Sequence, residues 1–279
     1  MAPSNGYGAL PTTNSRSNTI SEEEQQLLIR GGNQPSKTVG WRKRMTVDVR
    51  RDWADLVLLA CYIITGLLDS ASISTWGSFV SMQTGNTVYF GLGIAAPHES
   101  TRWIKSGTSL GCFCIGSVFF SSFHRVLSPS PKRRWVLCAS FALQMLFIAG
   151  AAAILSFGPQ SSSEEKKEAI DWPVLVPIAL VAFQSCGQAV ASRALKYNAL
   201  TSVVLTSIYC DLFSDAELLA AHNPERNRRV GAPTLLLIGA VLGGVLARST
   251  VGAAGVLWIA AAMKLLVVIS WLLWPAEKE

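Results

Sequence analysis

Six long apolar stretches that carry almost no charge constrain the fold of this chain more than any other feature. A helix needs about 20 predominantly apolar residues to cross a membrane, because lipid cannot hydrogen-bond to the backbone. The stretches are residues 53–69, 108–123, 135–157, 172–191, 231–247 and 251–274. They predict an all-α fold, a polytopic membrane helix bundle with about six transmembrane helices.

The distribution of charge supports the same class and divides the chain into regions. Charged residues make up 15% of the sequence and the mean hydropathy is +0.34, whereas soluble domains contain about 25% charged residues. Residues 1–52 are rich in polar and charged side chains. We therefore expect a disordered cytoplasmic tail over residues 1–52 and a transmembrane domain over residues 53–275.

Two short motifs in the tail bear on localisation. The sequence EEQQLL (23–28) matches the acidic dileucine pattern that endosomal and vacuolar sorting adaptors read, and YGAL (7–10) matches a tyrosine-based pattern. Both patterns are short. They leave the plasma membrane and the vacuolar or endosomal membrane as the two expected locations.

Residues 79–96 and 199–213 are apolar but less regular, and the first contains Thr84-Gly85-Asn86. If only the six clear stretches cross, one side of the membrane carries 15 Lys and Arg residues and the other 5. Such a bias marks the cytoplasmic side and places both termini there. One additional full crossing at 79–96 would put Arg125–Arg134 outside. The count favours two re-entrant segments, while an ordinary helix with one glycine stays open.

A weak internal repeat links the two irregular stretches. Gly66 precedes Thr84 by 18 positions, and Gly187 precedes Thr206 by 19. The halves would be residues 53–157 and 172–274, each with three full crossings, so the second half would be inverted. Inverted repeats with broken segments near the midplane recur in secondary transporters.

Polar residues inside the apolar stretches are the candidate site. Lys264 lies near the middle of the last stretch, where a charge costs at least about 2.5 kcal/mol and needs a partner or a watery cavity. Asp69 could neutralise Lys264, bind a cation or carry a proton. The alternatives are a structural lysine pair and an interfacial aspartate. The candidates for a substrate or ion pathway are Asp69, Gln83, Thr84, Gly85, Asn86, Gln188, Thr206 and Lys264.

The segment GLLDSASISTWGSFVSMQTGNTVYFGLG (66–93) resembles the signature of the YoaK-type membrane proteins, a domain-of-unknown-function family. The matching residues are Gly66, Asp69, Phe79, Val80, Thr84, Gly85 and Asn86. Ser70 directly after Asp69 departs from the pattern, and so does Ser207, where the family often has Gly. The resemblance spans about residues 50–275 and implies about six spans but no established reaction.

We expect a small-solute transporter or permease of unknown substrate, and the alternative is a non-transporting membrane scaffold or trafficking component. An enzyme is not expected, because the chain has no H-E-x-x-H motif and its three histidines, His98, His124 and His222, lie in the connectors between the apolar stretches. All six cysteines fall within the apolar or irregular stretches, which disfavours disulfides and zinc. No cofactor, metal or nucleic acid is expected. Membrane lipid and an unknown small solute are the expected partners, and a homo-oligomer stays open.

Overall fold

The computed structural model describes residues 37–128, 130–159 and 167–277. Residues 1–42 form one unit and residues 43–279 a second. Of the first unit only residues 37–42 are described, and they lie in the helix α2, Lys37–Thr46. The sorting motifs at 7–10 and 23–28 therefore lie outside the described residues.

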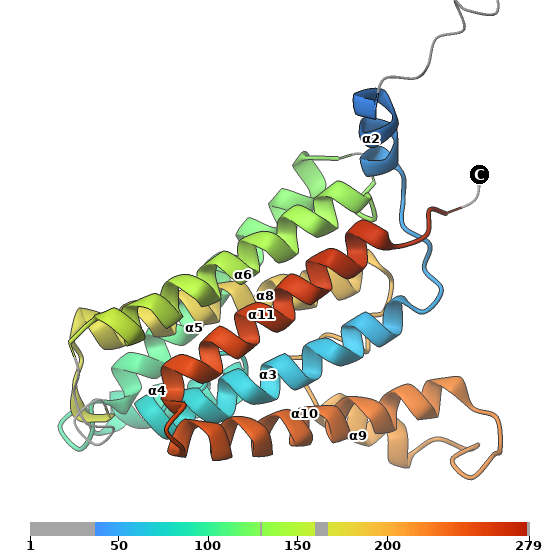
Figure 1. Ribbon diagram of the computed structural model, residues 1–279. Helices are drawn as coiled ribbons and strands as arrows, with labels where there is room; N and C mark the ends of the chain where they lie inside the picture. Colours follow the sequence, from blue (N-terminus) through green and yellow to red (C-terminus); the bar gives the residue numbers. More distant parts are fainter. Residues whose placement is uncertain (1–36, 129, 160–166, 278–279) are drawn as a thin grey trace, which may run out of the picture. The chain divides into compact units, whose positions relative to one another are not determined.

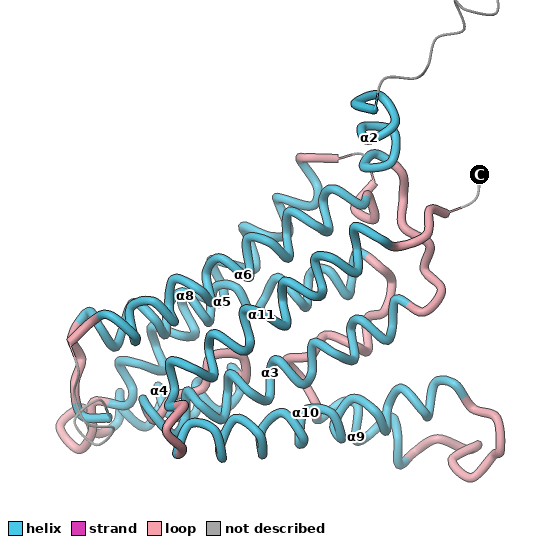
Figure 2. The backbone as a smooth tube through the Cα atoms, in the orientation of Figure 1, coloured by secondary structure: helices cyan, strands magenta, loops and turns pink. Residues whose placement is uncertain are grey.

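Six long helices form the body of the second unit, and all regular structure in the described ranges is helical (Figure 2). They are α3 (Ala54–Trp76), α5 (Arg102–Val126), α6 (Arg134–Phe157), α8 (Trp172–Ala194), α10 (Pro224–Arg248) and α11 (Gly252–Leu273). Each has 22–25 residues and is apolar enough to cross a membrane, since a rise of about 1.5 Å per residue carries it past the roughly 30 Å of hydrocarbon. The expected six-helix membrane bundle is confirmed.

α3 is longer than the sequence indicated, because it continues seven residues beyond position 69 to Trp76. The added turns contain polar residues that a lipid-facing helix would avoid. Ser72 is buried and donates to the carbonyl oxygen of Ser78 at 2.7 Å. These polar side chains face the segment that follows α3, which is why hydropathy alone ends the helix too early.

After α3 the chain turns back into the bundle through residues 77–82, hereafter break 1. Gly77 ends α3 with a φ of 76°, a conformation that suits glycine. The carboxylate of Asp69 accepts hydrogen bonds from the backbone N–H groups of Val80 (2.9 Å) and Ser81 (3.0 Å). Since Asp69 lies two turns before the end of α3, break 1 reaches that depth within the bundle.

The short helix α4 (Gln83–Ala95) follows break 1 and runs antiparallel to the beginning of α5. Near its start, Asn86 donates to Ser109 at 3.0 Å. Near its end, a Cβ on Gly93 would lie 1.9 Å from Cβ of Trp103. α4 therefore starts inside the bundle and returns to the end where α3 finishes and α5 begins, which is a re-entrant arrangement.

The second half repeats this arrangement at the opposite end of the bundle (Figure 1). Residues 195–205, hereafter break 2, fold back until the hydroxyl of Ser202 accepts a 2.9 Å hydrogen bond from Gln188 of α8. The eight-residue helix α9 (Thr206–Phe213) follows and packs against α10. α4 and α9 are both too short to cross a membrane.

The long helices of each half pack against long helices of the other half, in corresponding pairs. α3 of the first half packs along α10 of the second, α8 packs along α5, and α6 lies against α11. Glycines allow the close approach: a Cβ on Gly66 would lie 2.1 Å from the carbonyl oxygen of Leu236, and a Cβ on Gly116 2.5 Å from that of Phe183. This equivalence supports the inverted repeat.

Most of the described cationic residues gather at the end where α3 begins and α8 ends, hereafter the basic end. Arg51 donates to the carbonyl oxygen of Lys196 at 3.0 Å, and Arg134 donates to that of Arg44 at 2.7 Å. Residues 44–50 also lie here. Val49 pairs with Ala276, and other backbone groups of residues 44–50 find partners at the ends of α6 and α11.

Candidate functional site

Lys264 lies in the middle of α11 with no exposed surface. Its ammonium group donates hydrogen bonds of 2.6 Å to the side-chain oxygens of Gln144, on α6, and Gln188, on α8. It also lies 4.9 Å from the ring centroid of Phe141, within the range of a cation–π interaction. These contacts bring three helices from both halves to one buried cation.

The two glutamines are oriented so that their oxygens face the lysine. The Gln188 amide nitrogen donates to Thr65 at 3.0 Å and to Ser202 at 2.9 Å, while the Gln144 nitrogen donates to Ser140 at 3.3 Å. Because each amide nitrogen is held elsewhere, only the oxygen is left for Lys264. We name these six residues, Lys264, Gln144, Gln188, Thr65, Ser202 and Ser140, the Lys264 cluster.

A glycine is required where α6 meets α8 beside this cluster. A Cβ on Gly187 would lie 2.6 Å from the amide nitrogen of Gln144 and 2.7 Å from its Cδ. Any larger residue would push the Gln144 side chain away from Lys264. The repeat glycine of the second half therefore positions a lysine partner.

Lys264 forms no ion pair among the described residues, and it does not meet Asp69. Both carboxylate oxygens of Asp69 instead accept hydrogen bonds from break 1. One accepts from the backbone N–H groups of Val80 and Ser81, and the other accepts from the Ser81 hydroxyl. The hypothesis that Asp69 neutralises Lys264 is not realised in this conformation. Asp69 anchors break 1, whereas Lys264 holds a charge that only neutral oxygens compensate.

The Thr-Gly-Asn motif divides between the interior and the surface. Asn86 is fully buried, accepts from the Phe79 N–H at 3.1 Å and donates to the Phe79 carbonyl oxygen at 2.8 Å. Gln83 donates to Ser109 at 3.2 Å, and a Cβ on Gly85 would lie 2.9 Å from the Phe79 ring. Thr84 is exposed. Asn86, Gln83 and Gly85 therefore shape break 1.

The predicted pathway residues thus separate into three places. Gln188 and Lys264 lie together in the Lys264 cluster, Asp69 and the Thr-Gly-Asn segment lie at break 1, and Thr206 is exposed at the start of α9. One hydrogen bond joins α8 to break 1, since the Ser185 hydroxyl donates to the Val80 carbonyl oxygen at 3.0 Å.

Gln144, Thr65 and Ser202 belong to the site although the sequence did not single them out. One signal could have identified Gln144. It precedes Lys264 by 120 positions, and Gly66 precedes Gly187 by 121. Within an inverted repeat, Gln144 and Lys264 therefore fall within one position of each other, and residues at such corresponding positions can meet at the axis that relates the two halves.

Gln184 provides unused hydrogen-bonding capacity one turn from Gln188. It is fully buried, and within the described part of the chain neither its amide nitrogen nor its oxygen has a partner. A buried unpaired amide costs about 1–3 kcal/mol per group, so such groups are rare unless water or a ligand uses them. Residues four apart share a helix face, which places Gln184 on the same face as Gln188.

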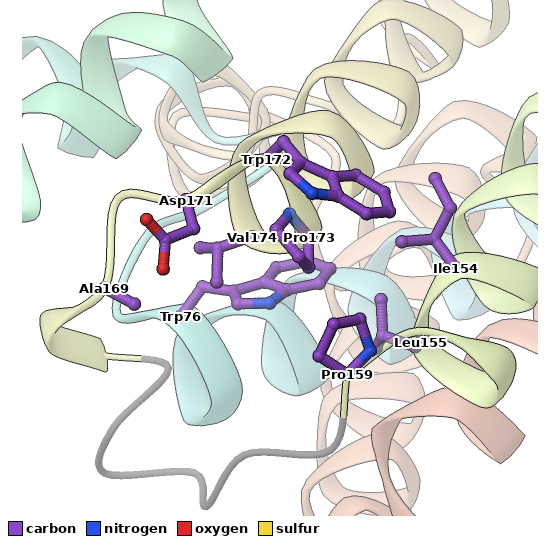
Figure 3. A pocket seen from close by; sticks show the side chains of 9 residues that line it. All are labelled: Trp76, Ile154, Leu155, Pro159, Ala169, Asp171, Trp172, Pro173 and Val174. Carbon is purple, nitrogen blue, oxygen red and sulfur yellow. The ribbon is translucent and has the colours of Figure 1, made fainter.

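A pocket of about 300 Å³ opens at the end of the bundle opposite the basic end. Figure 3 shows the Trp76 indole lying across it, with Trp172 and Pro173 from α8 beside the ring and Leu155 from α6 nearby. The indole nitrogen of Trp76 is buried and has no hydrogen-bond partner in the described ranges. Because Trp76 is the last residue of α3, this pocket adjoins break 1.

A family model described as "Protein of unknown function (DUF1275)" matches residues 57–270, and the chain belongs to this family. The match begins within α3 and ends within α11, and it includes the four other long helices and both breaks. None of the curated proteins and none of the solved structures matches the chain. The membrane fold and the family are therefore established, and the geometry of the site carries the functional argument.

Proposed function

We propose that this membrane protein is a transporter that carries a small polar solute through the Lys264 cluster. The observation that carries the proposal is Lys264 itself, a fully buried cation whose partners come from both halves of the bundle. Ionisable groups at such depth are costly and mark solute or ion pathways. Neutral amide oxygens alone stabilise this charge less than a carboxylate or an anionic solute would.

The two breaks support the same function. They lie at opposite ends of the bundle and approach the level of the cluster from each end (Figure 1). Irregular backbone at membrane depth is tolerated where protein buries it or where it lines a cavity. In transporters built from inverted repeats, such segments form the solute site and its gates.

Hydrogen bonds between the halves would couple the two gates. Ser185 of the second half holds the Val80 carbonyl oxygen of break 1, and Tyr62 of the first half donates to the Ala199 carbonyl oxygen of break 2 at 3.4 Å. Each break is thus braced by the long helix of the other half. Opening one break would disturb the helix that braces the other.

The proposed orientation places the basic end, and both termini with it, in the cytoplasm. Arg44, Arg51, Arg134, Lys196 and Arg228 all lie there. An excess of Lys and Arg near span ends is typical of the cytoplasmic side. Break 1 would then open outward, or to the lumen, and break 2 to the cytoplasm.

Uptake into proteoliposomes tests the proposal. Radiolabelled monosaccharides, amino acids, monocarboxylates and nucleobases would be offered to the full chain, to Lys264→Met and to Leu265→Met. Leu265 is the neighbouring exposed residue and serves as the control. At least one class should accumulate with the wild type and the control but not with Lys264→Met. If no class moves, a membrane scaffold or trafficking component becomes the better account. If Lys264→Met transports as the wild type does, the solute does not pass through the Lys264 cluster.

A further inference from the structure

A second pocket, of about 140 Å³, lies at the basic end and is independent of the Lys264 cluster. Its walls come from the start of α3, the first residues of break 2 and the start of α10. The charged and aromatic residues that line it are Arg51, Lys196, Tyr197, Glu225, Arg228 and Arg229, four cations and one carboxylate. The pocket is thus a concave, cationic surface rather than a scatter of basic residues.

Two of these cations have no acidic partner within the described part of the chain. Arg228 pairs with Asp55 at 2.5 Å, and Arg229 pairs with Asp215 at 2.9 Å and with the pocket residue Glu225 at 3.2 Å. Arg51 contacts only neutral groups, the Lys196 carbonyl oxygen and the Tyr197 ring. The exposed Lys196 ammonium group has no described partner. The pocket therefore retains positive charge that the protein does not neutralise.

The Arg51 and Arg228 guanidinium groups and the Lys196 backbone are held in place before any ligand arrives. The Arg51 guanidinium lies 4.5 Å from the Tyr197 ring centroid and the Arg228 guanidinium 5.4 Å from it, distances typical of cation–π contacts. The Tyr197 hydroxyl donates to the Arg51 carbonyl oxygen at 3.2 Å. Lys196 has a φ of 60°, an unfavourable conformation for a non-glycine residue that persists only where its surroundings enforce it.

The pocket also adjoins an apolar surface. Ile208 lines it and belongs to α9. α9 exposes Tyr209 and Phe213, and Val204 is exposed at the end of break 2. A free phosphate ion would use only the cationic wall. A phospholipid would use both surfaces, since its phosphate needs the cations and its acyl chains need the apolar face.

We propose that this pocket binds the phosphate of an anionic phospholipid headgroup from the leaflet at the basic end. Arg51 and Lys196 supply the uncompensated charge, and Arg228 adds a guanidinium beside them. Because Lys196 and Tyr197 lie at the start of break 2, the bound lipid stabilises the closed form of this segment. This site stands apart from the proposed transport route and does not require transport activity.

Native mass spectrometry of the full chain in detergent tests the site with dioleoyl phosphatidic acid, dioleoyl phosphatidylcholine, inorganic phosphate and glycerol 3-phosphate as probes. We expect adducts with phosphatidic acid that outnumber those with phosphatidylcholine. Lys196→Gln should weaken the phosphatidic acid adducts by about tenfold, the typical loss of one charge-assisted contact. Arg51→Gln should act in the same direction.

Arg193→Gln is the matched control, since Arg193 is exposed at the same end but does not line the pocket. It should leave binding unchanged. Lys196 makes no described side-chain contact, so its substitution keeps the fold, and thermal unfolding of each variant checks this. Equal binding of the two lipids, or equal loss in Arg193→Gln, overturns the proposal. Binding of inorganic phosphate or glycerol 3-phosphate as tight as that of phosphatidic acid overturns the lipid as the ligand.

Discussion

Lys264 donates a 2.6 Å hydrogen bond to Gln144, and the spacing of the repeat places these two residues within one position of each other in the two halves of the chain. One half supplies a buried cation and the other an amide oxygen at the same place. The fold is therefore similar in the packing of its two halves but carries a charge from only one of them at its centre.

The Lys264–Gln144 contact should appear as a coupling energy. Gln144→Leu alone leaves Lys264 with one amide partner fewer, whereas in a Lys264→Met background it removes only an oxygen that is already unpaired. We expect a double-mutant cycle in SDS unfolding to give a coupling of about 1–3 kcal/mol. Additive effects would show that the two side chains do not interact.

Asp69 should be required for the structure of break 1 rather than for the charge of the Lys264 cluster. Asp69→Asn keeps one acceptor oxygen but loses the charge that the Val80 and Ser81 groups stabilise. The free energy of unfolding should fall by about 2–3 kcal/mol. Asp211→Asn is the control, because Asp211 is exposed. Equal effects of the two variants would contradict the anchoring role.

Two nearby glycines of α10 should respond to alanine with opposite signs. A Cβ on Gly239 would lie 2.2 Å from the Ile63 carbonyl oxygen, whereas a Cβ on Gly244 meets nothing within 4 Å. Gly239→Ala should destabilise the protein by about 1–3 kcal/mol. Gly244→Ala should stabilise it by about 0.4–1 kcal/mol through the unfolded chain. Thermal unfolding of both variants measures the difference.

The connector between α9 and α10 should lose order in acid. The Glu217 backbone N–H, together with Asn223 and Arg229, holds the pKa of Asp215 below its ordinary value of 3.8. A carboxyl with a lowered folded pKa stabilises above pH 3.8 and loses that contribution as pH falls through the folded value. The hydrogen-exchange protection factors of residues 214–223 should therefore be unchanged from pH 7 to pH 5 and should fall below pH 3.8. Asp215→Asn should remove this dependence.

The long helices and both breaks were predictable because lipid imposes length and polarity on any spanning segment. Thr84-Gly85-Asn86 and the Lys and Arg count located the first re-entrant segment, which the structure has at break 1 and α4. The end of α3 was not predictable from hydropathy. Asp69 and Ser72 are polar, and only the folded break supplies the groups that satisfy them.

The candidate site was predictable in part. Lys264 stands out because a charge within an apolar stretch is costly unless a partner stabilises it. Its partners come from α6 and α8, and the close approach of these two helices depends on Gly187. Gln144 read alone is an ordinary polar residue of a membrane helix. Asp69 was grouped with Lys264 because opposite charges attract. The sequence does not reveal that backbone N–H groups would occupy its carboxylate first.

Accessibility of the two breaks from opposite sides tests the central claim most directly. Thr84 and Thr206 are both exposed, and each would become the single reactive cysteine in a background with Cys112, Cys114 and Cys210 replaced by serine. Cys61, Cys138 and Cys186 are buried and can remain. An impermeant thiol reagent should label Thr84→Cys only from the outer or lumenal side and Thr206→Cys only from the cytoplasmic side. Labelling of both positions from the same side would contradict the inverted, two-gate architecture.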